Sequence, residues 1–289
     1  MKLNYINQIK ANISIYASKK TSNILDGTYK SIYTGKSMNF ENLRDYVIGD
    51  DVKDIDWKSS SRTGKLLVKQ FIAEKKHNIL FVMDSGIKFD ADTDLHENKK
   101  QLALYLAGTL GYIAIKNNDY VGMIYQNDKI IFKPFKYNLY NLEQYLCEYD
   151  KLNNSGNFNI ENILKHIYNK IQKRMIIFVI TDIDGINNID EKVLKKLNQI
   201  HDVLFININD NYMFGENIYD VNNSKYIPNL ILKNSKLNNI EKQIKNDLLK
   251  KNELKLKRNN ISIISISSIK QINSKIIELL EEHKNANTI

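Results

Sequence analysis

Two aspartates follow strand-like apolar runs, and their positions suggest a site for a cation. The run 78–83 leads into Asp84, and the run 175–181 leads into Asp182. In a parallel sheet covered by helices, ligands bind at the carboxyl ends of the strands, which share one edge. Carboxylate oxygens at that edge suit a hard cation such as Mg²⁺. The alternative is that each aspartate only caps the loop or helix that follows it.

The elements that must position these aspartates alternate between strands and helices. We expect strands at 78–83, 120–125, 129–132, 175–181, 203–207 and 261–266, and helices at 99–116, 139–149, 160–172, 191–199, 239–257 and 269–283. Buried strands that alternate with helices predict an α/β fold with a doubly wound, mostly parallel sheet and helices on both faces. Strands 120–125 and 129–132 are close enough to form a hairpin at one edge.

The first 76 residues have a different pattern. Residues 1–20 carry isoleucines near helical spacing and predict an amphipathic helix. From residue 22 onward, glycines separate short alternating pieces such as 31–33 and 65–71, which is typical of strands and turns. We therefore divide the chain into an N-terminal helix and β/turn region at 1–76, which leans on the sheet, and an α/β domain at 77–289.

Composition narrows the class of protein. The chain has 289 residues, with 42 Lys and Arg against 33 Asp and Glu, a net charge of +9. Such an excess is compatible with nucleic-acid binding, but the basic stretches do not alternate with aromatic side chains, and we expect no nucleic-acid partner. No apolar run approaches the roughly 18 residues of a membrane span, and the first residues lack a signal-peptide pattern. We expect a cytoplasmic protein without membrane insertion.

A motif in the first quarter of the chain is similar to the signature of a bacterial family. Residues 39–71 read NFENLRDYVIGDDVKDIDWKSSSRTGKLLVKQF. They resemble the pattern LRxYxxGDDxRxIDWxxSARxGxLxVxxF, which precedes a von Willebrand factor A-like domain in the family called domain of unknown function 58. The resemblance continues more loosely over most of the chain and implies the same fold.

The resemblance also implies a degenerate metal-ion-dependent adhesion site (MIDAS). Type A domains build that site from a D-x-S-x-S motif, a later Thr and a final Asp. This chain keeps Asp84 and Asp182 but has Gly86 and Lys88 at the serine positions, and residues 157–159 offer no hydroxyl where the Thr belongs. We expect a Lys88 ammonium between the two aspartates to neutralise both carboxylates, so that the site holds no metal and no cofactor is needed.

Metal binding stays open as the alternative at this site. Ser85, Thr181 and Asp184 would supply further oxygen ligands to Mg²⁺ beside the two kept aspartates.

The family resemblance implies a non-enzymatic, protein-binding adaptor that works with a MoxR-type AAA+ ATPase in a chaperone-like system on an unknown client. We expect Lys88, Arg44, Arg62 and Trp57 to contact the partners. For Trp57 we favour instead a place in the interface between the 39–71 motif and the sheet. The alternatives from other classes are a Mg²⁺-dependent hydrolase that uses Asp84 and Asp182, and nucleic-acid binding through the basic surface.

Overall fold

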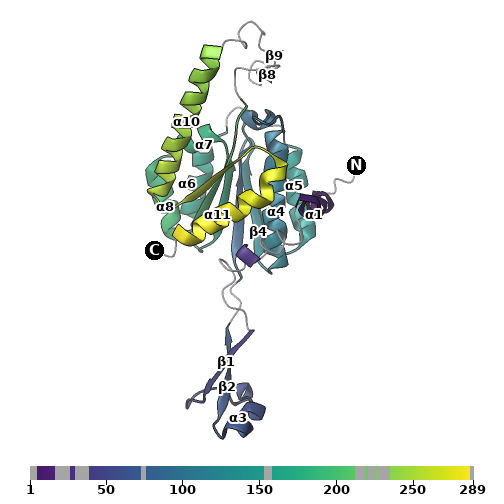
Figure 1. The fold of residues 1–289 in the computed structure, drawn as a ribbon, viewed down its shortest axis with the longest axis vertical. Helices are drawn as coiled ribbons and strands as arrows, with labels where there is room; N and C mark the ends of the chain where they lie inside the picture. The colour runs from purple at the N-terminus through teal and green to yellow at the C-terminus, as the bar shows by residue number, and fades with distance from the viewer. Residues whose placement is uncertain are drawn as a thin grey trace.

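A six-stranded sheet lies at the centre of the protein (Figure 1). The computed structural model describes residues 5–16, 27–29, 39–72, 76–152, 158–211, 219–220, 225–226 and 235–286. The strands of the sheet are β3 (Asn78–Met83), β4 (Tyr120–Gln126), β5 (Ile130–Lys136), β6 (Ile176–Thr181), β7 (Asp202–Ile208) and β10 (Ser262–Ile266). Their order is β10-β7-β6-β3-β4-β5, and neighbours are parallel except for the antiparallel pair β4 and β5. The chain winds outward from β3 in both directions, which is the doubly wound topology.

Helices cover both faces of this sheet (Figure 1). One face packs against α1 (Tyr5–Tyr16), α4 (Lys99–Lys116), α5 (Leu139–Asp150) and α11 (Ile272–Ala286). The other packs against α6 (Ile160–Lys170), α7 (Ile183–Asn187), α8 (Glu191–Ile200) and α10 (Ser235–Lys257). Two 3₁₀ turns, η2 (Ile87–Asp90) and η3 (Ile269–Gln271), and a short pair, β8 (Tyr219–Asp220) with β9 (Lys225–Tyr226), complete this part of the chain.

The alternation of side chains along β3 explains why the sheet is buried on both faces. Ile79, Phe81 and Met83 lie in the core with α4, whereas Leu80 and Val82 lie in the core with α6. Successive residues of a strand point to opposite faces, so a run that is apolar throughout needs helices on both sides. The α/β fold class expected from the sequence is confirmed.

Helix α1 packs against α4 and α5 of the sheet domain. Its Tyr5 and Ile6 backbone amides donate to the two Glu143 carboxylate oxygens of α5 at 2.6 and 2.7 Å. Ile9 lies so close to Gly108 of α4 that a Cβ there would approach its Cδ1 to 2.2 Å. The expected division at residue 76 therefore does not separate α1 from the sheet.

Residues 39–72 form a small subdomain of their own, which we call the 39–72 subdomain. It consists of antiparallel strands β1 (Asn39–Asp45) and β2 (Leu67–Ile72), the 3₁₀ turn η1 (Val52–Asp54) and helix α3 (Trp57–Thr63). Figure 1 places it apart from the sheet. Trp57 is 62% exposed, so the expectation that it lies buried in an interface with the sheet is wrong.

The boundaries of most elements agree with the sequence to within a few residues, and β5, α3 and α7 are the differences with a clear physical reason. Strand β5 continues to Lys136 through Pro134, which is tolerated because β5 is an edge strand. Helices α3 and α7 are too short to show a periodic pattern, and the sequence did not predict them. The strand expected at 31–33 lies outside the described residues. Within the described part of the chain, no helix combines the length and apolar character needed to cross a bilayer.

Candidate functional site

Asp84 and Asp182 lie at the carboxyl ends of the adjacent strands β3 and β6, where the winding reverses. Both side chains are buried. Asp84 Oδ1 accepts a 2.9 Å hydrogen bond from the Gly86 backbone amide, and Asp182 Oδ1 accepts one of 2.9 Å from Gly185 as the N-cap of α7. Each aspartate thus acts as a local cap, as one alternative proposed, while the sheet also brings the pair together.

Thr181 binds directly to this pair. Its hydroxyl donates a 2.6 Å hydrogen bond to Asp84 Oδ2 across the two strand ends. Gly185 allows α7 to begin directly against Thr181, because a Cβ at residue 185 would lie 2.0 Å from Thr181 Oγ1. The Thr181 hydroxyl is therefore enclosed by the protein and not open to a ligand.

A lysine that the sequence analysis did not single out provides the positive charge of the site. Lys99, the first residue of α4, has a side chain with no solvent exposure. Its ammonium lies 3.1 Å from Asp182 Oδ2, forms an ion pair with Asp210, and sits 5.0 Å from the centre of the Phe89 ring. Asp210 follows β7, so three neighbouring strands each contribute one aspartate to this edge. We call Asp84, Asp182, Asp210 and Lys99 the strand-end cluster.

The charges of the cluster shift one another. Burial raises the pKa of Asp84 to about 7, and the nearby Asp182 carboxylate adds to this rise. Burial also opposes ionisation of Asp182, but the Lys99 ammonium outweighs it and holds the pKa of Asp182 below its usual value. Burial alone would lower the pKa of Lys99, yet the two carboxylates that it contacts keep that pKa raised. Near neutral pH the Lys99–Asp182 pair is therefore fully charged, while Asp84 is partly protonated.

Lys88 does not occupy the position that the sequence analysis expected. It lies in η2, half-exposed, and forms an ion pair with Asp184 at the rim of the site. The 3₁₀ turn that begins at Ile87 carries Lys88 away from the strand direction. The expected neutralisation of Asp84 and Asp182 by Lys88 is wrong in this respect, because the cation between carboxylates is Lys99.

The other oxygen atoms proposed as metal ligands are engaged elsewhere. The Ser85 hydroxyl donates to the Gln126 carbonyl oxygen at the end of β4. At the position of the missing Thr, Phe158 lies beside Gly86 and Asn159 caps α6, while Asn157 lies outside the described residues.

A metal-ion-dependent adhesion site would need Asp84 and Asp182 to be free to bind a divalent cation. The Lys99 ammonium already lies between two carboxylates, and a divalent cation there would meet its charge. In the described part of the chain, no three His, Cys, Asp or Glu side chains are arranged to hold a metal ion. The residues present therefore do not fit a metal-ion-dependent site.

Lys99 and Asp210 were not predicted as site residues, although the sequence contains a pattern that points to each. Lys99 precedes Leu102 and Ala103 by three and four positions, which places it on the buried face of α4. Asp210 follows β7 much as Asp84 and Asp182 follow their strands, but the expected strand ended at residue 207 and hid this relation.

Arg44 lies in the 39–72 subdomain and fixes a turn within it. Its guanidinium makes two hydrogen bonds to the Asp50 carboxylate, at 2.7 and 2.6 Å. Asp50 in turn accepts a 2.9 Å hydrogen bond from the Val47 amide, and Gly49 supplies the positive φ of 112° that this turn needs. The Arg44 hydrogen bonds hold the pKa of Asp50 below its usual value. Arg44 is thus an internal support of the turn 46–50.

Large apolar side chains are exposed around this turn. Ile48 at its tip is 96% exposed, and Val47, Val52, Trp57 and Leu66 are each about half exposed or more. The buried apolar side chains described in the 39–72 subdomain are only Ile55 and Val68. Arg62 is exposed on α3 and makes no ion pair or hydrogen bond within the described residues. Arg62 and Trp57 are therefore both exposed on the surface of the 39–72 subdomain, and their contact with a partner stays a prediction.

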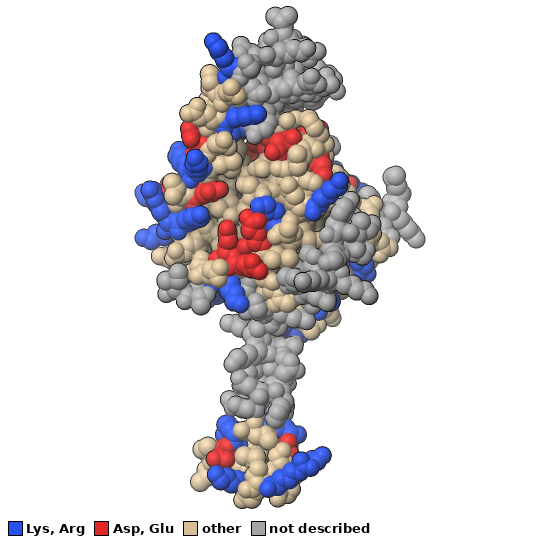
Figure 2. Space-filling model, in the orientation of Figure 1, with Lys and Arg blue, Asp and Glu red and all other residues tan. Residues whose placement is uncertain are grey.

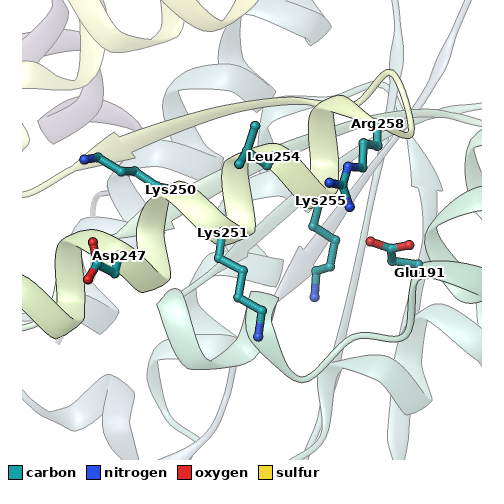
Figure 3. Close-up of a pocket in the computed structure, with 7 residues that line it drawn as sticks. All are labelled: Glu191, Asp247, Lys250, Lys251, Leu254, Lys255 and Arg258. Atoms are coloured by element: carbon teal, nitrogen blue, oxygen red, sulfur yellow. The ribbon is translucent and has the colours of Figure 1, made fainter.

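A shallow groove of about 330 Å³ lies along α10 and is lined by Glu191, Asp247, Lys250, Lys251, Leu254, Lys255 and Arg258 (Figure 3). The Lys255 ammonium donates to the carbonyl oxygens of Ile186, Asn187 and Ile189 at 2.7 to 3.1 Å. Lys255 therefore stabilises the end of α7 and is not available to a ligand.

The family described as "Protein of unknown function DUF58" matches residues 42–213. An uncharacterized protein of Mycobacterium tuberculosis and one of Mycobacterium bovis are each 25% identical over 115 residues, which make up 40% of this chain and 36% of those proteins. The chain thus spans about a third of the length of the curated relatives it matches.

Solved structures similar to the chain include von Willebrand factor A-like domains. BatB, a conserved hypothetical protein of Bacteroides thetaiotaomicron, has a TM-score of 0.46 and 15% identity, with 74% of this chain and 100% of that chain covered. A von Willebrand factor type A structure from Catenulispora acidiphila has a TM-score of 0.42 and 8% identity, with 72% of this chain and 43% of that chain covered.

Proposed function

Because the chain belongs to the DUF58 family of proteins of unknown function, we propose that it is a non-enzymatic protein-binding module that works with a MoxR-type AAA+ ATPase on a client protein. The ATPase partner is implied by the family resemblance of residues 39–71. The residues we assign to its binding are the exposed apolar side chains of the 39–72 subdomain.

The exposure of those side chains is the observation that carries the proposal. Ile48, Trp57 and their neighbours present large apolar groups to solvent, whereas Ile55 and Val68 are the buried apolar side chains among those described in this subdomain. Exposed apolar groups concentrated on one part of a surface mark sites of protein binding, and Trp and Arg are the side chains that most often anchor them. Arg62 lies on the same helix as Trp57 and adds a charged contact.

The strand-end cluster supports a binding role over a Mg²⁺-dependent hydrolase. A hydrolase would need Asp84 and Asp182 as metal ligands, but Asp182 binds the Lys99 ammonium and Asp84 accepts from Thr181. The hydroxyl that donates to Asp84, that of Thr181, is buried against Gly185 and cannot reach a substrate. The charged groups left at the rim are Lys88 and Asp184, which suit contact with a client.

The distribution of charge does not favour nucleic acid. Basic side chains gather on α8 and α10, while α11 carries the exposed acids Glu278, Glu281 and Glu282 (Figure 2). A nucleic-acid backbone needs a continuous basic track, and acids on the neighbouring helix interrupt it. Binding of this kind would weaken steeply with salt, which gives a simple way to recognise it.

The test is affinity purification of the tagged protein from its native cells with ATP present, followed by mass spectrometry. We expect near-stoichiometric recovery of an AAA+ ATPase. The double variant Ile48→Ala and Trp57→Ala should lose it, whereas Leu254→Ala, which removes an apolar side chain 57% exposed on α10, should keep it. Equal recovery with all three proteins, or no ATPase with any, would overturn the proposal.

A further inference from the structure

Lys99 occupies the position at which a cation would bridge the strand ends. Its ammonium contacts a carboxylate oxygen of Asp182 from β6 and one of Asp210 from beyond β7. Two carboxylate oxygens and solvent are also what a protein offers Mg²⁺ or Mn²⁺ when it binds them weakly. A point charge at Lys99 Nζ therefore satisfies the same oxygens that a divalent cation would use.

The way Lys99 reaches this position makes it a fixed part of the site. Its side chain has no solvent exposure and passes close to the ring of Phe89. A long lysine side chain normally keeps its ammonium in water, so complete burial requires compensating carboxylates. Asp182 and Asp210 provide them, and without Lys99 the buried Asp182 carboxylate would lose its ion-pair partner.

Asp210 is the most exposed residue of the strand-end cluster. The Asp210 side chain is 23% exposed to solvent, whereas Asp182 and Asp84 are almost completely buried. A cation that entered from the Asp210 side would arrive at the place held by the Lys99 ammonium.

We propose that the Lys99 ammonium is a permanent substitute for a divalent cation at the strand-end cluster, so that the native protein binds no divalent cation there. Removal of the Lys99 side chain then creates such a site from Asp182, Asp210 and water. This inference does not depend on the proposed partner, because it concerns only the four residues of the cluster.

The experiment compares the melting temperature of purified full-length variants in EDTA and in millimolar MnCl₂. The native protein should show no Mn²⁺-dependent shift. Lys99→Ala should melt lower in EDTA and regain about 5 °C or more as Mn²⁺ saturates its site. Lys99→Met removes the same charge but fills the space, so Mn²⁺ should not restore it. Lys99→Ala combined with Asp182→Asn lacks one ligand and should lose most of the Mn²⁺ response.

Because two unpaired carboxylates can prevent folding, Lys99→Ala is also expressed and purified with Mn²⁺ throughout. Folded protein obtained only with Mn²⁺ supports the proposal. If Lys99→Ala fails in both media, Lys99→Ala combined with Asp84→Asn, which removes a neighbouring buried carboxyl but keeps both ligands, replaces it. Calorimetric binding of Mn²⁺ to the native cluster that Asp182→Asn abolishes would overturn the proposal. So would the lack of any Mn²⁺ response in every folded variant without Lys99.

Discussion

Thr181 donates its hydroxyl hydrogen to Asp84 across the ends of two adjacent parallel strands, at 2.6 Å. The bond lies inside the protein, beside the charged pair of Lys99 and Asp182. It links the two strand ends where the winding of the sheet reverses, and it leaves Asp84 without a charged partner of its own. The consequences of this arrangement for pH, packing and partner binding are open to measurement.

The first prediction concerns pH. An Asp carboxyl in the unfolded chain titrates near 3.9, whereas burial and the Asp182 carboxylate raise the pKa of Asp84 to about 7. Between these values the folded protein holds the proton more tightly, so the contribution of Asp84 to the free energy of unfolding falls as pH rises from about 4 to about 7. The amide of Asp84→Asn cannot titrate. The difference in the free energy of unfolding between pH 5 and pH 8, measured by chemical unfolding, should therefore be smaller in this variant by a few kcal/mol.

Burial also raises the pKa of Asp210 in the same cluster, so Asp210 adds a fall of the same sign that Asp84→Asn should leave in place. Lys99 and Asp182 keep their charges through this window, and burial raises the pKa of Tyr149 well above its usual value, so its phenol stays neutral. Asp184→Asn removes an exposed carboxylate of the same site and serves as the matched control, which should keep the native slope. An Asp84→Asn protein with the native slope would contradict the assignment of the proton to Asp84.

The second prediction concerns Gly185. Alanine in a helix is normally more stable than glycine by up to about 1 kcal/mol. At this position its Cβ would lie 2.0 Å from Thr181 Oγ1. We therefore expect Gly185→Ala to destabilise the protein by about 1–3 kcal/mol in urea unfolding, because the start of α7 must move. Gly27→Ala, with nothing within 4 Å of the new Cβ, is the control. A stabilised Gly185→Ala protein would show that this contact does not constrain α7.

The third prediction concerns the attachment of α1. The Glu143 carboxylate accepts from the first two amides of α1, Tyr5 and Ile6, and its negative charge suits a helix N-terminus. Glu143→Ala should lower the free energy of unfolding by about 1–2 kcal/mol and speed proteolysis within α1. Glu281→Ala removes an exposed carboxylate from α11 and should change neither quantity measurably. Equal protease resistance of the Glu143→Ala and native proteins would mean that the contacts of α1 with α4 hold the helix without this carboxylate.

Much of the fold could be predicted from the sequence because its determinants are local. A strand such as β6 is apolar from Ile176 to Ile180, and a helix such as α6 repeats its isoleucines at helical spacing. Either pattern can be recognised without knowing what packs against it. The small elements α3 and α7 have no such pattern, since they are only 7 and 5 residues long and each begins at a single aspartate cap.

The candidate site was predicted only in part, because its charges are paired across the fold. The strand-end positions of Asp84 and Asp182 are local and could be recognised. The identity of their cation was not local: Lys88 lies closer to Asp84 in sequence, but a 3₁₀ turn points it to Asp184, and Lys99 reaches Asp182 from the start of α4. A short motif after one strand shows which residues follow that strand. It does not show which helix begins close to the strand's carboxyl end.

The fourth prediction concerns the turn that presents Ile48. Arg44 makes two hydrogen bonds to Asp50, and Asp50 accepts one from the Val47 amide. These contacts lower the pKa of Asp50, so its carboxylate stops supporting the turn only when the pH falls through that lowered pKa. A lysine cannot make the paired contact. In an NMR titration, Arg44→Lys should raise the pKa of Asp50 toward its usual value and speed exchange of the Val47 amide. Because the turn then no longer fixes Ile48, recovery of the ATPase should also fall.

Arg62→Lys, on the exposed face of α3, should leave the titration and the exchange rate unchanged. Native values in Arg44→Lys would mean that Gly49 and the strands β1 and β2 shape the turn without help from Arg44.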